Sequence, residues 1–328
     1  MLRRRTLLGA AAIAAAAAAP PPPGRAQAPR WEPVRPIRLI VPYAAGGGTD
    51  LLGRALAESL RPLLPQPVVV ENRTGAAGVV GSEVVARAEP DGHTLLAVVS
   101  THVINRYHLA SLPYDPIRDF GPVAMLTRNT MVLCAGTGQP FADLRAMLDH
   151  ARRNPGRVGT GSTEAVSSFA GQELARRAGV DMPDVQYRSG GPLMNDIVAG
   201  HLPVGWTSTV SAMPHMGTGR VRILAVSPAT RTPFFPEAPT LQELGFEGFD
   251  LAGWVAMVGP AGLPAGIAAR LHGALEQAYA DTTLKGRFAT MGVEADLRPP
   301  AALAEAVRRE DRLWAAAAAA GHVRPQQQ

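Results

Sequence analysis

The sequence contains very little cysteine and, beyond its first residues, no long apolar run. Cys134 is the single cysteine among 328 residues, so no internal disulfide bond can form. A fold without disulfides depends on a large apolar core, and roughly 300 mature residues are enough for two domains. After residue 26, no stretch approaches the roughly 18 uninterrupted apolar residues of a membrane-spanning helix. We therefore expect a soluble mature protein held together by apolar packing.

Familiar catalytic and metal-binding motifs are also missing. None of the eight histidines stands in H-x-x-x-H or H-E-x-x-H spacing, and Cys134 has no metal-type partner. No serine lies in a G-x-S-x-G elbow. We therefore expect no metal, no cofactor and no enzymatic activity, and we interpret His93 and His102 as structural. An exported α/β hydrolase is the least favoured alternative, because no pair of nucleophile and base can be named.

Residues 1–26 have the features of a signal peptide, with a resemblance to the twin-arginine type. Three arginines (Arg3 to Arg5) precede an apolar stretch from Thr6 to Ala19, and we favour cleavage before Gln27. This segment carries four arginines and no acid, so the formal net charge of +5 falls to about +1 after its removal. That balance gives no support to nucleic-acid binding. The protein is expected to be exported to the periplasm.

Strand-like and helix-like segments alternate along the chain, which predicts an α/β fold with largely parallel sheets. The expected strands are 37–41, 68–71, 95–99, 123–126, 131–135, 157–159, 185–187, 221–226 and 251–258. The expected helices begin near residue 49 and then cover 81–88, 141–153, 166–177, 192–199, 264–279 and 300–319. The proline-rich run 230–247 is expected to be an ordered but irregular connection.

The segment 35–50 is the most informative part of the chain. An apolar strand ends at Pro42, a glycine triplet follows, and Thr49 or Asp50 is expected to cap the next helix. Such a junction directs unpaired N–H groups and a positive helix end toward a carboxylate or phosphate. No Lys-Ser or Lys-Thr follows the glycines, so this is not a P-loop. We expect Gly47 to need a positive φ, and Asp50 to be a cap rather than a general base.

Four further loops repeat this chemistry at the ends of predicted strands. They are Val99–Thr101, Gly159–Thr163, Tyr187–Pro192 and Trp206–Thr209. In open parallel sheets, the loops at the carboxyl ends of the strands converge on a ligand crevice. Together these loops predict a cleft rich in N–H and O–H donors and poor in charge, although Gly, Ser and Thr are also what any tight turn uses.

The order of these motifs resembles the extracytoplasmic solute-binding receptors of the tripartite tricarboxylate transporters, also called Bug receptors. The similarity covers essentially the whole mature chain. It is carried by Pro36–Asp50, Gln66–Gly78, Glu89–Leu96, Leu112–Pro116 with Asp119 and Phe120, Ala225–Ser227, Pro239–Thr240 and Gly259–Pro264. Each motif is weak alone, and the combination is highly specific.

The resemblance implies a two-lobed periplasmic-binding-protein fold (type II-like) that closes around a small organic carboxylate. One lobe would comprise 27–128 and 245–328, and the other 129–244. The ligand-binding residues it implies are Tyr43, Ala44, Ala45, Gly46, Gly47, Gly48, Thr49, Asp50, Ser100, Thr101, Gly161, Ser162, Thr163, Tyr187, Thr207 and Ser208. The receptor would be a monomer that delivers its ligand to membrane transporter subunits. Alternatively, it would be a ligand-sensing receptor that docks on a sensor protein to regulate genes.

Two positions depart from the pattern of the family. Thr207 stands where many members have Asp, which removes a counter-charge for an amino group and makes an amino-acid ligand less expected. The start of the helix after Thr163 introduces Glu164, which would repel a dicarboxylate if it faced the cleft. The simpler interpretation of Glu164 is a solvated acid at a helix start, where the helix dipole favours negative charge.

Overall fold

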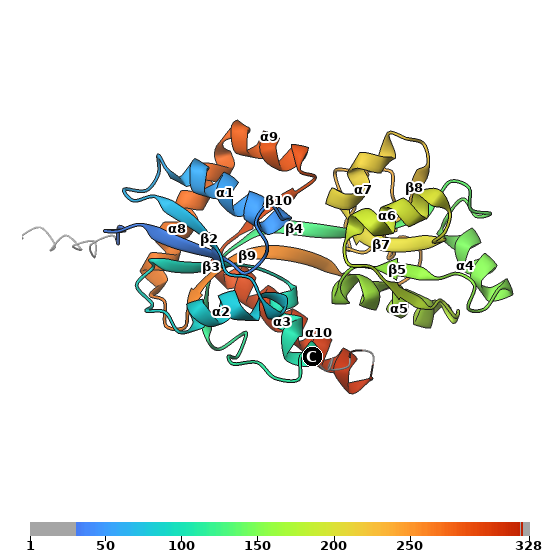
Figure 1. Cartoon of the computed structure of the whole chain (residues 1–328), viewed down its shortest axis with the longest axis horizontal. Helices are drawn as coiled ribbons and strands as arrows, with labels where there is room; N and C mark the ends of the chain where they lie inside the picture. Colours follow the sequence, from blue (N-terminus) through green and yellow to red (C-terminus); the bar gives the residue numbers. More distant parts are fainter. Residues whose placement is uncertain (1–30, 322, 324–328) are drawn as a thin grey trace, which may run out of the picture. The chain divides into compact units, whose positions relative to one another are not determined.

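A computed structural model describes residues 31–321 and 323, so the signal peptide predicted for residues 1–26 lies outside the described residues. From Trp31 the chain alternates strands and helices, as the sequence predicts (Figure 1). The first elements are β1 (Ile37–Val41), α1 (Gly48–Leu60), β2 (Val68–Asn72), η1 (Ala76–Gly78), α2 (Val79–Ala86), β3 (Thr94–Val99), α3 (Thr101–His108) and β4 (Phe120–Gly136). Among the residues that the structure describes, no helix is both long and apolar enough to cross a bilayer.

The middle and last parts of the chain continue the alternation. The middle part contains α4 (Leu144–Arg153), β5 (Thr160–Ser162), α5 (Ala165–Ala178), β6 (Asp184–Gln186), α6 (Gly190–Ala199), β7 (Val204–Ser208), α7 (Thr209–Met216) and β8 (Val221–Val226). The last part contains β9 (Ala252–Pro260), α8 (Ala265–Ala280), α9 (Thr282–Thr290), β10 (Glu294–Arg298) and α10 (Pro300–Ala319). Between β8 and β9 the chain forms turns and one isolated bridge, so the expected irregular connection is confirmed.

Strand β4 belongs to two sheets. Its residues Phe120–Thr130 pair with β9, and its residues Met131–Gly136 pair with β7 and β8. The first sheet adds β1, β2, β3 and β10, with β1 parallel to both β2 and β3; the second adds β5 and β6, with β5 parallel to both β6 and β7. Figure 1 shows β4 running from one group of elements to the other. Two short strands were predicted here, and the structure shows one strand of 17 residues.

Large apolar clusters occupy both sheets, as expected of a chain without disulfides. Leu39, Leu56 and Leu271 belong to the cluster of the first sheet, and Leu193 and Ile197 to that of the second. A third cluster contains residues from both, so the apolar core is continuous across β4. Cys134 lies fully buried in the second sheet, and burial raises the pKa of its thiol to about 12. The thiol is therefore an inert packing group.

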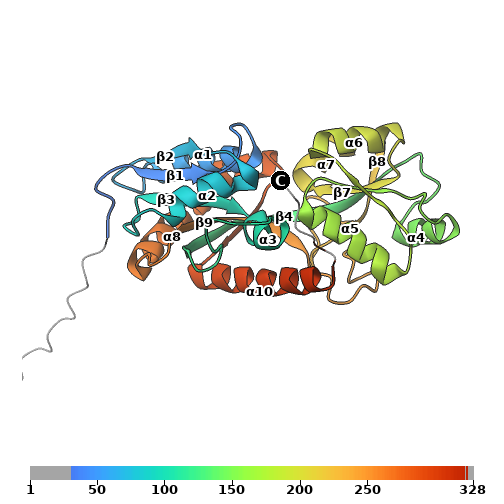
Figure 2. The ribbon, with the colours of Figure 1, turned by 60° about the horizontal axis from the view of Figure 1, so that its bottom comes forward.

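Helix α10 joins parts of the chain that are distant in sequence. It packs along α3 and β4 (Figure 2), and its Trp314 ring meets Phe169 of α5 edge to face at 5.0 Å. Glu310 accepts hydrogen bonds from the indole N–H groups of Trp254 (2.7 Å) and Trp314 (3.2 Å). Burial raises the pKa of Glu310 to about 7, and the two indole bonds lower it in part. Contacts from α10 therefore reach β9 and α5, the elements next to the two groups of predicted site loops.

Candidate functional site

The glycine loop between β1 and α1 leaves the start of a helix open. Gly47 is the N-cap residue of α1, and no side chain caps the helix. Residues 44–48 are exposed. The positive φ of the loop lies at Gly46 (+79°) and not at Gly47 (−74°), so the expectation for Gly47 was wrong. The first N–H groups of α1 are thus available to an anion, because a helix start has no backbone partners of its own.

Asp50 is neither the cap of α1 nor a poised base. It is the third residue of the helix, and its buried carboxylate accepts hydrogen bonds from the Gly46 N–H (2.8 Å) and from Asn72 Nδ2 (3.0 Å). Arg54 forms an ion pair with it at 3.0 Å. Burial raises its pKa, but the bonds from Arg54, Gly46 and Asn72 outweigh burial and leave the pKa below its usual range. Asp50 is therefore an ionised group that fixes the glycine loop, and the capping prediction for Thr49 or Asp50 was wrong.

Tyr43 connects the glycine loop to its neighbours. A side chain at Gly78 would lie only 3.3 Å from the Tyr43 ring, so the ring covers the loop after β2. Burial raises the pKa of the Tyr43 hydroxyl, a hydrogen bond with the Val99 backbone lowers it in part, and Tyr114 and Glu164 raise it further. Tyr43 is thus near the end of β3 and electrostatically coupled to Glu164, which lies beyond β5.

A strained turn beside Tyr43 was missed by the sequence analysis. Ala76 and Ala77 have φ angles of +44° and +53°, a region that costs a residue with a side chain about 1 kcal/mol or more. Asn105 donates a hydrogen bond to the Ala77 carbonyl (3.1 Å) and helps to hold this conformation. The clue in the sequence was Gly75-Ala-Ala-Gly78, with glycines on both sides of the turn. Strain of this kind gathers at ligand sites, so we add this turn to the candidate site.

Ser100 and Thr101 lie at the carboxyl end of β3. Ser100 is buried, its N–H donates to the Trp254 carbonyl (3.1 Å), and it precedes α3, which begins at Thr101. Because β1, β2 and β3 are parallel, their carboxyl ends share one edge of the first sheet. The structure therefore brings Ser100 and Thr101 to the same edge as the glycine loop.

The predicted residues of the second sheet have partners inside the protein. Ser162 donates to Asp184 (2.8 Å), as does Ser168 of α5 (2.6 Å). A side chain at Gly161 would lie 2.5 Å from Leu202, so this glycine permits close packing. The N–H of Thr163 donates to Ser167 Oγ (3.0 Å). Each of these contacts gives its residue a structural role. That Gly161, Ser162 and Thr163 bind the ligand stays a prediction.

The remaining predicted residues lie beside them. Tyr187 donates to Asp196 (2.7 Å), and burial, followed by Asp196, raises its pKa to about 12. Thr207 is buried within β7, and Ser208 is the half-buried N-cap residue of α7. The tetrapeptide 206–209 was expected to follow a strand. In the structure, residues 206–208 are instead the last three residues of strand β7. Arg188 is exposed in the loop before α6.

The two histidines considered as candidates are structural. His102 is fully buried, contacts the Pro116 carbonyl (3.1 Å), and packs on Tyr114 and Phe120. Burial lowers its pKa to about 4, so it is neutral at physiological pH. His93 is also buried, next to the turn that contains Asp91. The structural interpretation of both residues is confirmed.

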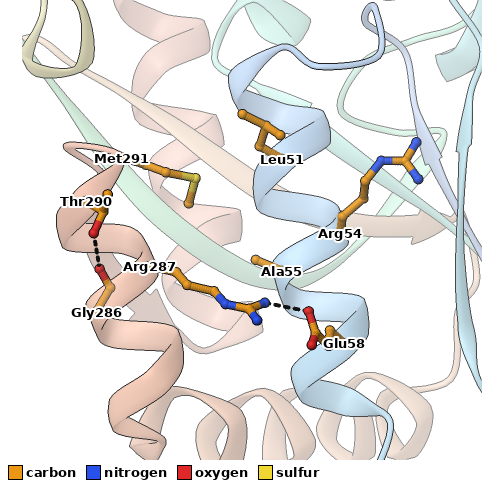
Figure 3. Close-up of a pocket in the computed structure, with 8 residues that line it drawn as sticks. All are labelled: Leu51, Arg54, Ala55, Glu58, Gly286, Arg287, Thr290 and Met291. Carbon is orange, nitrogen blue, oxygen red and sulfur yellow. Dashed lines mark hydrogen bonds and ion pairs between the residues drawn. The ribbon is translucent and has the colours of Figure 1, made fainter.

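A surface hollow of about 490 Å³ lies between α1 and α9, and its wall on α1 begins at Leu51, directly after Asp50 (Figure 3). Leu51, Ala55 and Met291 supply apolar walls, and Arg287 is paired with Glu58 across it. Because its charged groups are already paired, this hollow offers less to an anion than the open start of α1.

Comparison with known proteins identifies the family. The family model described as the tripartite tricarboxylate transporter family receptor matches residues 52–305. The chain belongs to this receptor family. It is 33% identical over 293 residues to the UPF0065 protein in the tcbD-tcbE intergenic region of Pseudomonas sp. strain P51, covering 88% of this chain and 87% of the relative.

Solved structures of similar proteins show the same fold. The periplasmic binding protein BugD matches with a TM-score of 0.73 and 30% identity, over 90% of this chain and all of BugD. MatC from Rhodopseudomonas palustris, solved with bound malate, matches with a TM-score of 0.71 and 30% identity, over 87% of this chain and 99% of MatC. The predicted α/β periplasmic-binding-protein fold is confirmed. The boundaries of the two lobes, 128/129 and 244/245, stay a prediction.

Proposed function

We propose that this receptor captures a small organic carboxylate in the periplasm and delivers it to the membrane subunits of a tripartite transporter. It acts as a monomer, carries out no chemical reaction, and loses residues 1–26 on export. Membership of the receptor family supports this proposal, and so does the bound malate of the similar protein MatC.

The observation that carries the proposal is the uncapped start of α1 behind a glycine loop that is already fixed. The Asp50 carboxylate, which is bonded to Asn72 and Arg54, accepts a hydrogen bond from the Gly46 N–H and so fixes the loop. Residues 44–48 stay exposed. A carboxylate that binds there meets N–H donors that do not need to be reordered, and charge-assisted hydrogen bonds of this kind are strong. The positive end of the helix dipole adds to the attraction.

The remaining predicted contacts would complete the site from two sides. Ser100 and Thr101 stand at the same sheet edge as the glycine loop, and α3, which begins at Thr101, contacts α5, which follows the predicted residues Gly161 to Thr163. A ligand between these groups would draw the two sheets together. The bends would occur near residues 127–131 of β4 and between residues 226 and 256, where the chain passes from one sheet to the other.

Native mass spectrometry of freshly purified protein tests this proposal, because a periplasmic receptor often retains its ligand. We expect a bound small carboxylic acid, and the same acid should raise the melting temperature of ligand-free protein. A ligand at 100 times its Kd adds about 2.7 kcal/mol of stability. If no mono- or dicarboxylic acid of up to about eight carbons shifts the melting temperature, the proposed function is wrong.

A further inference from the structure

Asn129 lies in β4 at the point where this strand passes from the first sheet to the second (Figure 1). It is half-buried, and it pairs with Gly253 of β9 in the register of the two strands. Asparagine is uncommon within strands. Among the residues that the structure describes, its side-chain amide has no hydrogen-bond partner. The two N–H donors and the oxygen acceptor of this amide are therefore free to bind another molecule.

Ser100 lies beside Asn129. A side chain at Gly253 would stand 3.3 Å from Asn129 Cβ and 3.4 Å from Ser100 Oγ, so the glycine lets these two polar residues lie close together over β9. Ser100 is buried, and its side chain does not cap α3. Within the described part of the chain, its hydroxyl also has no hydrogen-bond partner. The Ser100–Asn129 pair thus brings two unpaired polar groups together at the end of β3.

The Ser100–Asn129 pair lies on the face of the first sheet that α1 covers. Side chains alternate along a strand, so Gly253 is on the same face of β9 as Val255. Val255 belongs to the apolar cluster that contains Leu52 of α1, and Tyr43, at the start of the glycine loop, packs on the same cluster. The pair is therefore on the side of the sheet where the uncapped helix start lies.

The cation of β4 is on the opposite face. Arg128 pairs with Trp254, whose indole N–H donates to Glu310 of α10 (2.7 Å). The Arg128 guanidinium donates to Thr230 Oγ1 (2.7 Å). A charged group of a ligand would thus meet only a neutral amide at Asn129. An uncharged hydroxyl fits better, because it can accept a hydrogen bond from the amide N–H and donate one to the amide oxygen.

The polar residues at the end of β5 differ from this pair. Ser162 donates to Asp184 (2.8 Å), and Glu164 takes part in a capping box with Ser167 of α5. The expected acid at the helix start is therefore confirmed at Glu164, although the residue is partly buried and not fully solvated. These groups already serve the fold, whereas the Ser100–Asn129 pair is unpaired where the structure describes the chain.

We propose that Asn129 is a specificity-determining residue that binds an uncharged hydroxyl group of the ligand together with Ser100. The receptor then selects small hydroxy acids over the same acids without the hydroxyl. This inference rests on the proposed function, because the carboxylate of the ligand must be held at the start of α1. A site that hydrogen-bonds a hydroxyl rejects the analogue that lacks it, since the polar groups of the site are then left unpaired.

Pairs of acids that differ by one hydroxyl test the inference. Malate is compared with succinate, lactate with propionate and 3-hydroxybutyrate with butyrate, by calorimetric titration of the wild-type protein. We expect the hydroxy acid of the best-binding pair to bind about tenfold more tightly or better. Equal affinities within that pair would overturn the inference and leave the proposed function standing. If no acid with or without a hydroxyl binds, the proposed function itself fails.

The variant Asn129→Leu keeps a side chain of similar branched shape and removes its hydrogen-bonding groups. It should weaken the hydroxy acid about tenfold and leave the acid without the hydroxyl unchanged. Asn195→Leu, at an exposed position of α6, is the matched control and should change neither. Asn129→Ala adds no bulk at the strand crossing and should give the same selective loss if the leucine variant does not fold. An equal loss for both acids would show a structural role of Asn129 and overturn the inference.

Discussion

The loops of the two sheets use polar residues in opposite ways. At the end of β1, the polar side chains of Asp50, Asn72 and Arg54 bond to one another and to the Gly46 N–H, while residues 44–48 stay exposed and the start of α1 stays uncapped. At the end of β5, the Ser162 hydroxyl turns inward to Asp184. Polar side chains thus fix an exposed loop beside an open helix start in one sheet, and form an internal network in the other. Small polar residues at a strand end do not by themselves identify a ligand contact.

The largest effect on ligand affinity should come from a change in the conformation of the glycine loop. Gly46→Val places a branched side chain at a φ of +79° in the exposed loop, so the loop must change its conformation. We expect an affinity loss of at least about 3 kcal/mol, since several hydrogen bonds to a charged group are lost together. Calorimetric titration measures it. Gly219→Val is the control, because Gly219 has a similar φ of +66° and open surroundings in a remote turn. Equal affinities for the two variants would remove the distinction between the loops.

Asp50→Asn should weaken both folding and binding. Removing the buried charge leaves Arg54 and the Gly46 N–H with a poorer acceptor, which should cost about 2–3 kcal/mol of unfolding free energy. Because the folded-state pKa is lowered, the carboxylate stabilises the protein above the unfolded pKa of about 4, and this stabilisation is lost as the pH falls through the folded pKa. Urea unfolding at roughly pH 7 and pH 3 checks this. The difference between wild type and variant should shrink at the lower pH; a constant difference would argue against an ionised Asp50.

Ser162→Ala tests whether the loop after β5 serves the fold or the ligand. If Ser162 serves only Asp184, the variant should lose about 1 kcal/mol of stability and keep its ligand affinity. Ser168→Ala is matched to it, since Ser168 bonds to the same carboxylate from α5 and was not predicted to touch ligand. Chemical unfolding and titration of both variants would decide. An affinity loss confined to Ser162→Ala would mean that its hydroxyl turns to the ligand.

The smallest effect is expected at Arg188. This residue is exposed in the loop before α6, and an exposed ion pair contributes about 1 kcal/mol or less. Arg188→Gln should therefore change affinity little, at low salt and at high salt alike. A large loss that fades with added salt would show recognition by ion pairing and would contradict binding by neutral donors.

Part of the fold could be predicted from the sequence because it depends on local patterns. The bounds of β8 and α10 agree with the expected segments at both ends, since β8 is a short apolar run and α10 begins at a proline and continues in helix-forming residues. The continuity of β4 could not be predicted, because Thr127, Arg128 and Asn129 interrupt the apolar run in the middle of the strand. Thr127 is fully buried there, which depends on its neighbours β9 and β10.

The candidate site divides in the same way. The glycine loop could be located from its own residues, because a strand, three glycines and an amphipathic helix follow one another directly. The role of Asp50 depends on Asn72, and the role of Ser162 on Asp184, each 22 positions further along the chain. Neither pairing has a local signature, so both residues were interpreted only by type.

The central claim is that the ligand's carboxylate is held by the backbone N–H groups at the uncapped start of α1. Selective ¹⁵N-glycine labelling tests this directly, with amide resonances followed by NMR as the acid found by mass spectrometry is added. The account predicts the largest shift for Gly48, the first residue of the uncapped α1, because the N–H groups of Gly46 and Gly47 already donate to Asp50 and to the Ala44 carbonyl. It predicts a small shift for Gly286 in the hollow between α1 and α9. A large shift at Gly286 with an unchanged Gly48 would contradict it.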